Sequence, residues 1–150
     1  MSSTKATRPD LSEAVPSRPE SPGSDPSRDA LDGVIAERVR QAVAAADDRQ
    51  AVDLKVLALA EVSDFTDYFV ICSGTSDRQV QAIASAIDET LRTGKVRPLH
   101  QEGLSGGRWV LLDYGDFIVH VFQDETRRFY GLERLWSDAP DVTETFHPAS

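Results

Sequence analysis

The residues from Gly107 to Phe122 constrain the fold of this chain more than any other stretch. Two apolar, strand-like runs are separated there by residues 113–116 (Asp-Tyr-Gly-Asp). This is the composition of a tight turn, because glycine tolerates positive φ and aspartate accepts hydrogen bonds from turn amides. Both runs are almost continuously apolar, which indicates that both faces of the hairpin are covered. We therefore expect this hairpin to lie at the centre of a sheet.

Length and composition leave room for one domain of ordinary size. Residues 1–29 contain hardly any large apolar side chain, so burial cannot offset the entropy of ordering them. We interpret them as a disordered, acidic tail rich in Pro and Ser. Residues 30–138 are enough for one hydrophobic core. From residue 139 to residue 150 the chain is polar and contains Pro, which predicts a flexible C-terminal tail.

The charge narrows the choice of partners. A net charge of −9 argues against broad binding to nucleic acid, which needs basic side chains, and favours either a basic partner or solubility alone. No apolar run is long enough to span a membrane, and no secretory signal or transit peptide is recognisable. Cys72 lies in an apolar run, where we expect a buried, unreactive thiol. The simplest interpretation is a cytoplasmic protein without a membrane partner.

Apolar periodicity predicts the other elements. Ser76 and Gln79 have the spacing of a capping box, while Pro98 favours an edge strand. Asp124 can cap a last helix or pair of turns that carries Phe129, Leu132, Leu135 and Trp136. The expected elements before the hairpin are a helix over residues 29–48, strands over 52–60 and 68–72, a helix over 76–94 and a weak strand over 96–102. This order predicts an α/β fold, a small mixed sheet with helices packed on it.

The turn at residues 74–76 (Gly-Thr-Ser) could serve chemistry. Its amides lie in front of a helix, an arrangement that suits either an anion or a purely structural cap. A nucleotidyl transferase would add paired carboxylates, two residues apart on a strand, to hold Mg²⁺. Asp113 and Asp116 are three apart and straddle a turn, and Asp53 stands alone. We therefore expect no catalytic, metal-binding or cofactor-binding residues and no enzyme; the metal-dependent transferase is the alternative.

One face of the hairpin has a mixed character. Trp109, Leu111 and Asp113 share a face of their strand, and Tyr114 is expected at its tip. An aromatic, an aliphatic and a carboxylate side chain together favour a protein interface, although each aromatic residue could equally belong to the core. His120, between apolar neighbours, is expected to be hydrogen-bonded and either buried or half-buried. The residues alone predict an acidic α/β binding module.

Three stretches resemble the ribosomal silencing factor family, RsfS, also called Iojap-like. They are Asp64–Gln79, Gly107–Phe122 and Phe129–Trp136, in the family's order, within a resemblance that covers roughly residues 31–138. The resemblance implies a topology like that of nucleotidyltransferases without the catalytic carboxylates. It also implies binding to the large ribosomal subunit through ribosomal protein fourteen, which blocks joining of the small subunit and represses translation under nutrient limitation. Free members tend to be homodimers. One departure is Gly131, where many relatives have Asp.

Carried onto this chain, the resemblance assigns contacts with the ribosomal protein to six residues. Direct reading of nucleic acid is not expected, and no cofactor is implied. A dimeric adaptor for maturation of the large subunit would use the same surface with a different consequence. The six expected contact residues are Trp109, Leu111, Asp113 and Tyr114, with Asp116 and Tyr130 as neighbours.

Overall fold

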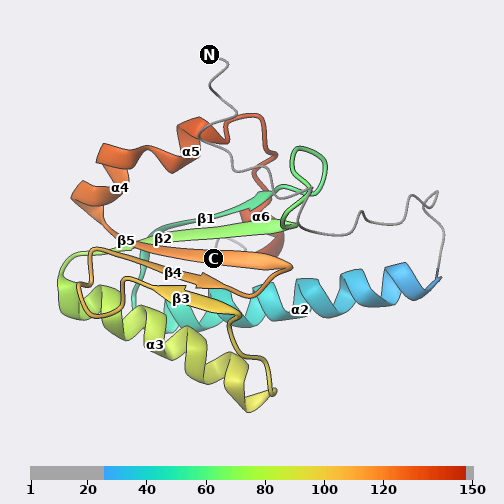
Figure 1. The fold of residues 1–150 in the computed structure, drawn as a ribbon, viewed down its shortest axis with the longest axis horizontal. Helices are drawn as coiled ribbons and strands as arrows, with labels where there is room; N and C mark the ends of the chain where they lie inside the picture. The colour runs from blue at the N-terminus through green and yellow to red at the C-terminus, as the bar shows by residue number, and fades with distance from the viewer. Residues whose placement is uncertain (1–25, 148–150) are drawn as a thin grey trace.

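The predicted hairpin supplies the middle strand of a five-stranded sheet of order β1-β2-β5-β4-β3 (Figure 1). The computed structural model describes residues 26–147. β2 and β5 are parallel and the other neighbours are antiparallel, so the predicted mixed α/β fold is confirmed. The elements are α2 (Pro26–Asp48), β1 (Val52–Ala58), β2 (Tyr68–Gly74), α3 (Asp77–Thr93), β3 (His100–Glu102), β4 (Trp109–Asp113), β5 (Phe117–Gln123), α4 (Asp124–Tyr130), α5 (Leu132–Leu135) and α6 (Thr143–Phe146).

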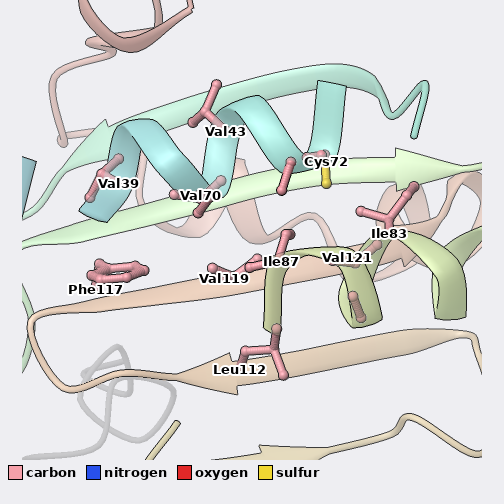
Figure 2. Packing of buried hydrophobic residues seen from close by; sticks show 14 of the residues in the cluster. Val39, Val43, Val70, Cys72, Ile83, Ile87, Leu112, Phe117, Val119 and Val121 are labelled. Atoms are coloured by element: carbon pink, nitrogen blue, oxygen red, sulfur yellow. The ribbon is translucent and has the colours of Figure 1, made fainter. Parts of the chain in front are cut away.

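Helices α2 and α3 lie side by side on one face of the sheet (Figure 1). Their apolar side chains recur at helical spacing and so form one stripe on each helix, which packs on the strands below. The side chains between helices and sheet are aliphatic in the main, as Figure 2 shows. Members of this core include Val39 and Val43 from α2, Ile83 and Ile87 from α3, and Val70, Leu112, Val119 and Val121 from the sheet.

The start of α3 confirms the predicted cap. Ser76 Oγ accepts a hydrogen bond from the backbone N–H of Gln79 at 3.1 Å. Gln79 Oε1 accepts from the N–H of Thr75 at 2.6 Å, one residue earlier than a capping box requires. The Gln79 amide also donates to the carbonyls of Arg49 and Gln50, just after α2. Gln79 therefore closes the front of α3 and joins it to the end of α2.

Some predicted boundaries shift for local reasons. Asp53 has φ of 51° and the β1–β2 register changes between Val52 and Lys55, so the strand predicted over residues 52–60 is irregular at its start. The strand predicted over residues 96–102 does lie at an edge of the sheet. It pairs with β4 only from His100 onward. The cap predicted at Asp124 is wrong by one residue. Gln123 occupies the N-cap position without a side-chain bond, and Asp124 lies in the first turn of α4.

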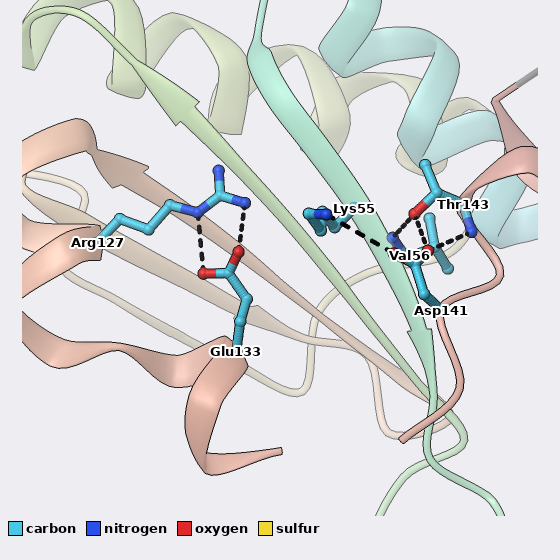
Figure 3. Close-up of polar contacts among 6 residues, drawn as sticks. All are labelled: Lys55, Val56, Arg127, Glu133, Asp141 and Thr143. Carbon is cyan, nitrogen blue, oxygen red and sulfur yellow. Dashed lines mark hydrogen bonds and ion pairs between the residues drawn. The ribbon is translucent and has the colours of Figure 1, made fainter. Parts of the chain in front are cut away.

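The C-terminal segment packs along the outer edge of β1 (Figure 3). Thr143 Oγ1 accepts from the N–H of Val56 at 2.9 Å, and the carbonyl of Pro140 accepts from the N–H of Ala58 at 2.9 Å. Phe146 is only 8% exposed and lies 5.3 Å from the ring of Tyr68. These bonds cover a sheet edge that would otherwise expose unpaired amides.

The tails predicted at both ends are therefore revised. A flexible tail over residues 139–150 is wrong for residues 139–147, and residues 148–150 lie outside the described part of the chain. At the other end, residues 26–29 of the predicted disordered tail belong to the first turns of α2, while residues 1–25 also lie outside the described part. Between these limits, no helix is long and apolar enough to cross a membrane.

Candidate interaction surface

The sheet face opposite α2 and α3 is covered unevenly. Trp136 and Phe65 pack over β2, where Phe69 and Ile71 are buried. The outward side chains of β4, by contrast, are only partly buried. These are Trp109, Leu111 and Asp113, which share one face as the sequence predicts. This part of the sheet is therefore open to a partner.

Trp109 is held by contacts on several sides. Its indole Nε1–H donates to Nδ1 of His120 on the neighbouring strand at 3.1 Å. Its ring stacks on Phe122, with centroids 4.8 Å apart, and lies 4.9 Å from the ring of Tyr130 on α4. A partly exposed tryptophan with so many fixed neighbours presents a rigid apolar shape to a partner, at little cost in side-chain entropy.

Two exposed aromatic residues extend this site. Phe129 is 78% exposed and Tyr130 is 56% exposed, and their rings lie 5.0 Å apart. We call Trp109, Phe129 and Tyr130 together the aromatic surface. They line a groove between α4 and the loop before β4, in which the other lining residues are Gly103, Gly106, Arg108, Glu125 and Thr126.

The exposure of Phe129 follows from the break between two short helices. The sequence places Phe129 with Leu132, Leu135 and Trp136 at helical spacing on one helix or a pair of turns, and the structure has two short helices, α4 and α5. Gly131 has φ of 58° and ends α4, so the chain changes direction before α5 begins. Glycine and aspartate both tolerate this left-handed conformation. A glycine inside an apparent helix can indicate a turn, and this signal could have identified Phe129 as a candidate for an exposed position.

Arg127, a buried residue of α4, stabilises the turn between α4 and α5 through hydrogen bonds. Its guanidinium, almost completely buried, donates to both carboxylate oxygens of Glu133, at 3.1 and 2.9 Å (Figure 3). A third bond, 2.7 Å long, runs to Ser73 Oγ at the end of β2. Hydrogen bonding from Arg127 holds the pKa of the Glu133 carboxyl below its usual range. The neighbouring aromatic surface is thus anchored to the central sheet by a charged, buried network.

Tyr114 does not join this surface, so its predicted position is wrong. Side chains alternate along β4, and Tyr114, next to the outward-facing Asp113, turns toward the helices. It is 8% exposed and stacks on Phe117 with centroids 4.9 Å apart. Burial raises the pKa of its hydroxyl. The structure therefore separates Tyr114 from Trp109, Leu111 and Tyr130.

The two aspartates of the hairpin shape its turn. Asp113 Oδ1 accepts from the N–H of Gly115 at 2.8 Å, and Gly115 adopts φ of 87°, as the turn requires. The carbonyl of Asp116 accepts from the N–H of Asp67 at 2.9 Å, which ties the turn to the start of β2. Both carboxylates are partly exposed at the edge of the site.

Two buried titratable groups match their sequence-based predictions. His120 is hydrogen-bonded and 4% exposed, and burial lowers its pKa to about 3. Cys72 is a buried free cysteine, and burial raises the pKa of its thiol to about 12. At neutral pH both groups are therefore uncharged.

The turn in front of α3 is occupied by side chains of the protein itself. Gln79 binds the amide and hydroxyl of Thr75, and the Gln123 side chain donates to Asp77. The Arg127 network holds Ser73 on the preceding strand. Among residues 26–147 no three His, Cys, Asp or Glu side chains gather as a metal site would require. This arrangement is a structural cap.

The elements and their order define a small mixed α/β domain, and Phe129 and Tyr130 are exposed on it beside Trp109. A family model described as "Ribosomal silencing factor during starvation" (RsfS) matches residues 34–150, and the chain belongs to this family. The predicted resemblance is thereby confirmed.

Individual relatives agree with this assignment. The ribosomal silencing factor RsfS of Bacillus subtilis (strain 168) is 46% identical over 99 residues, which cover 66% of this chain and 84% of the relative. A crystal structure of a protein from Bacillus halodurans has a TM-score of 0.64 and 40% identity, and covers 71% of this chain and 96% of that one. A mouse protein named "Mitochondrial assembly of ribosomal large subunit protein 1" is 34% identical over 90 residues, covering 58% of this chain and 40% of the relative.

Proposed function

We propose that this protein is a non-enzymatic silencing factor in the cytoplasm that binds the large ribosomal subunit through ribosomal protein fourteen. The bound protein sterically blocks joining of the small subunit and so represses translation under nutrient limitation. Membership of the RsfS family supports this proposal. The structural observation that carries it is the aromatic surface, with Phe129 and Tyr130 exposed beside the fixed ring of Trp109.

The contact residues proposed are those on the open part of the sheet and on α4. Large exposed aromatic side chains that lie together are a common mark of protein interfaces, where Trp and Tyr contribute much of the affinity. Asp113 and Asp116 are proposed at the rim. Tyr114 is omitted because it packs in the core. The central contacts are Trp109, Leu111, Phe129 and Tyr130.

The mechanism needs binding alone. A domain bound to the joining face of the large subunit excludes the small subunit as long as it binds the large subunit more tightly than the small subunit does. A net charge of −9 favours encounter with a basic ribosomal protein and disfavours contact with ribosomal RNA. We also propose that the free protein is a homodimer, which sedimentation equilibrium would test.

A role in assembly of the large subunit is the second candidate. The name of the mouse relative favours it. The same surface would then act on maturing subunits. Ribosome profiles of a deletion strain separate the two roles: immature large subunits indicate assembly, whereas an excess of joined ribosomes during starvation indicates silencing.

The decisive experiment is a subunit-joining assay with purified subunits. Replacing Phe129 and Tyr130 together by Ala should abolish the inhibition of joining and leave the fold intact, since both side chains are exposed. Leu31→Ala is the matched control, because Leu31 is 55% exposed but lies on α2, which packs on the opposite face of the sheet. Inhibition by the double variant equal to that of the parent would refute the site, and crosslinking of the parent to another ribosomal protein would refute the partner.

A further inference from the structure

The indole N–H of Trp109 points into the protein. An exposed tryptophan on an interface commonly leaves this group to water or to the partner. Here Nε1–H donates to Nδ1 of His120 at 3.1 Å, across the β4–β5 pair in which His120 lies opposite Leu111. The bond fixes the rotation of the indole in addition to the stacking on Phe122. The orientation of the Trp109 ring is therefore fixed by a buried residue of the neighbouring strand on the same face of the sheet.

His120 is itself held in one orientation. It is 4% exposed and lies between ring neighbours. The edge of its ring meets Phe69 on β2, with centroids 4.6 Å apart at 76°, and it lies nearly parallel to Phe122, 6.1 Å away at 14°. Phe69 packs in turn against Trp136 at 5.5 Å. Packing on both sides leaves the imidazole little freedom to turn away from Trp109.

The chemistry of the bond also fixes the state of the histidine. An indole N–H can only donate, so Nδ1 must accept and the proton of neutral His120 lies on Nε2. An imidazolium would carry protons on both nitrogens and could not accept. Burial keeps the ring neutral at physiological pH, because it lowers the pKa to about 3.

We propose that His120 is the positioning residue of the aromatic surface: by accepting the indole N–H it holds the Trp109 ring in the orientation that docks. This inference rests on the proposed function, since it concerns the same surface. His120 does not itself touch the partner. It reduces the entropy that Trp109 loses on binding, and its removal therefore weakens binding without removing any contact residue.

The first test observes Trp109 in the free protein. The chain has two tryptophans, so the indole ¹⁵N–¹H signals of Trp109 and Trp136 can be told apart by substitution. His120→Leu should shift the Trp109 signal and speed its hydrogen exchange at least about tenfold, because the N–H loses its acceptor. His120→Asn, whose side-chain oxygen can occupy the place of Nδ1, should restore slow exchange. Unchanged exchange in His120→Leu would overturn the inference.

The second test measures affinity for purified large subunits. His120→Leu should bind about fivefold more weakly than the parent, the effect of ordering one side chain on binding, and His120→Asn should bind within about twofold of the parent. Trp109→Phe removes the donor but keeps a ring, so adding His120→Leu to Trp109→Phe should change affinity less than about twofold. An equal loss in both backgrounds would show that His120 acts by another route.

The two proposals fail in different ways. If the parent protein does not bind large subunits, the proposed function is wrong. If the parent binds them and Trp109→Ala binds equally well, the proposed contact site is wrong and the docking role of His120 fails with it, whatever the indole signal does. If binding depends on Trp109 while His120→Leu binds normally, only the positioning role is overturned. Thermal unfolding of each variant confirms that it is folded before either comparison is made.

Discussion

The two faces of the sheet are built from different side chains, and we propose that one serves stability and the other recognition. The face under α2 and α3 is mainly aliphatic and closed by two long helices. The opposite face carries rings, among them Phe69, His120 and Phe122, and ends at the partly exposed Trp109. Aliphatic side chains fill space in any direction, whereas rings and their hydrogen bonds fix orientation. The first face holds the fold and the second presents a surface.

The largest expected effect is on the closed face. Ile87→Ala leaves a cavity under α3, where Ile87 is fully buried, and should lower the free energy of unfolding by about 3 kcal/mol. Leu111→Ala on the open face should cost less than about 1 kcal/mol, because Leu111 is only partly buried. Urea denaturation measures both. Equal losses would remove the distinction between the faces.

The second effect concerns pH and His120. The unfolded chain takes up a proton near the ordinary pKa of 6.5, but the folded protein only near 3, so stability is complete above pH 6.5 and is lost as the pH falls. Between pH 7 and pH 5 the loss should be about 2 kcal/mol.

The pKa values of Glu133 and Asp141 are also depressed, but from ordinary values of 4.5 and 3.8, so their contributions are lost only at lower pH. Urea titrations at several pH values provide the measurement. In His120→Asn the free energy of unfolding should hardly change between pH 7 and pH 5. If the variant still loses stability over this pH range, a group other than His120 causes the loss.

A smaller effect is expected at the cap of α3, which supports the closed face. Ser76→Ala removes the bond to the Gln79 amide and should cost about 1 kcal/mol. Ser85→Ala, at an exposed position within the same helix, is the matched control and should be neutral or slightly stabilising. Thermal unfolding of both variants tests this; a Ser76→Ala variant as stable as its control would show that the cap contributes nothing.

The smallest effect on stability is expected on the open face itself. Phe129→Ala should change the free energy of unfolding by less than about 0.5 kcal/mol, because its side chain is 78% exposed. The same urea experiment serves as the measurement. A loss above 1 kcal/mol would mean that Phe129 supports α4 and would weaken its assignment to the aromatic surface.

Local patterns predicted most of the elements. The hairpin, the α3 cap and the edge position of the Pro98 strand follow from turn chemistry and periodicity, which act over a few residues. Tyr114 was misplaced because a residue next to a turn can lie on either face, and only the register with β5 decides between them. Phe146 was missed because one apolar residue in a polar segment gives no periodic signal.

By itself, the sequence determined a mixed α/β domain, a buried and unreactive Cys72, a hydrogen-bonded His120, and a mixed face on β4. Membership of the RsfS family could also be recognised from its three motifs. Only the tertiary structure placed Tyr130 against Trp109 and turned the indole N–H toward His120. Only the tertiary structure also shows that residues 139–147 pack along the edge of β1. These contacts join residues far apart in the chain, and the packing of whole elements decides them, because no short stretch of sequence encodes which distant side chain it will meet.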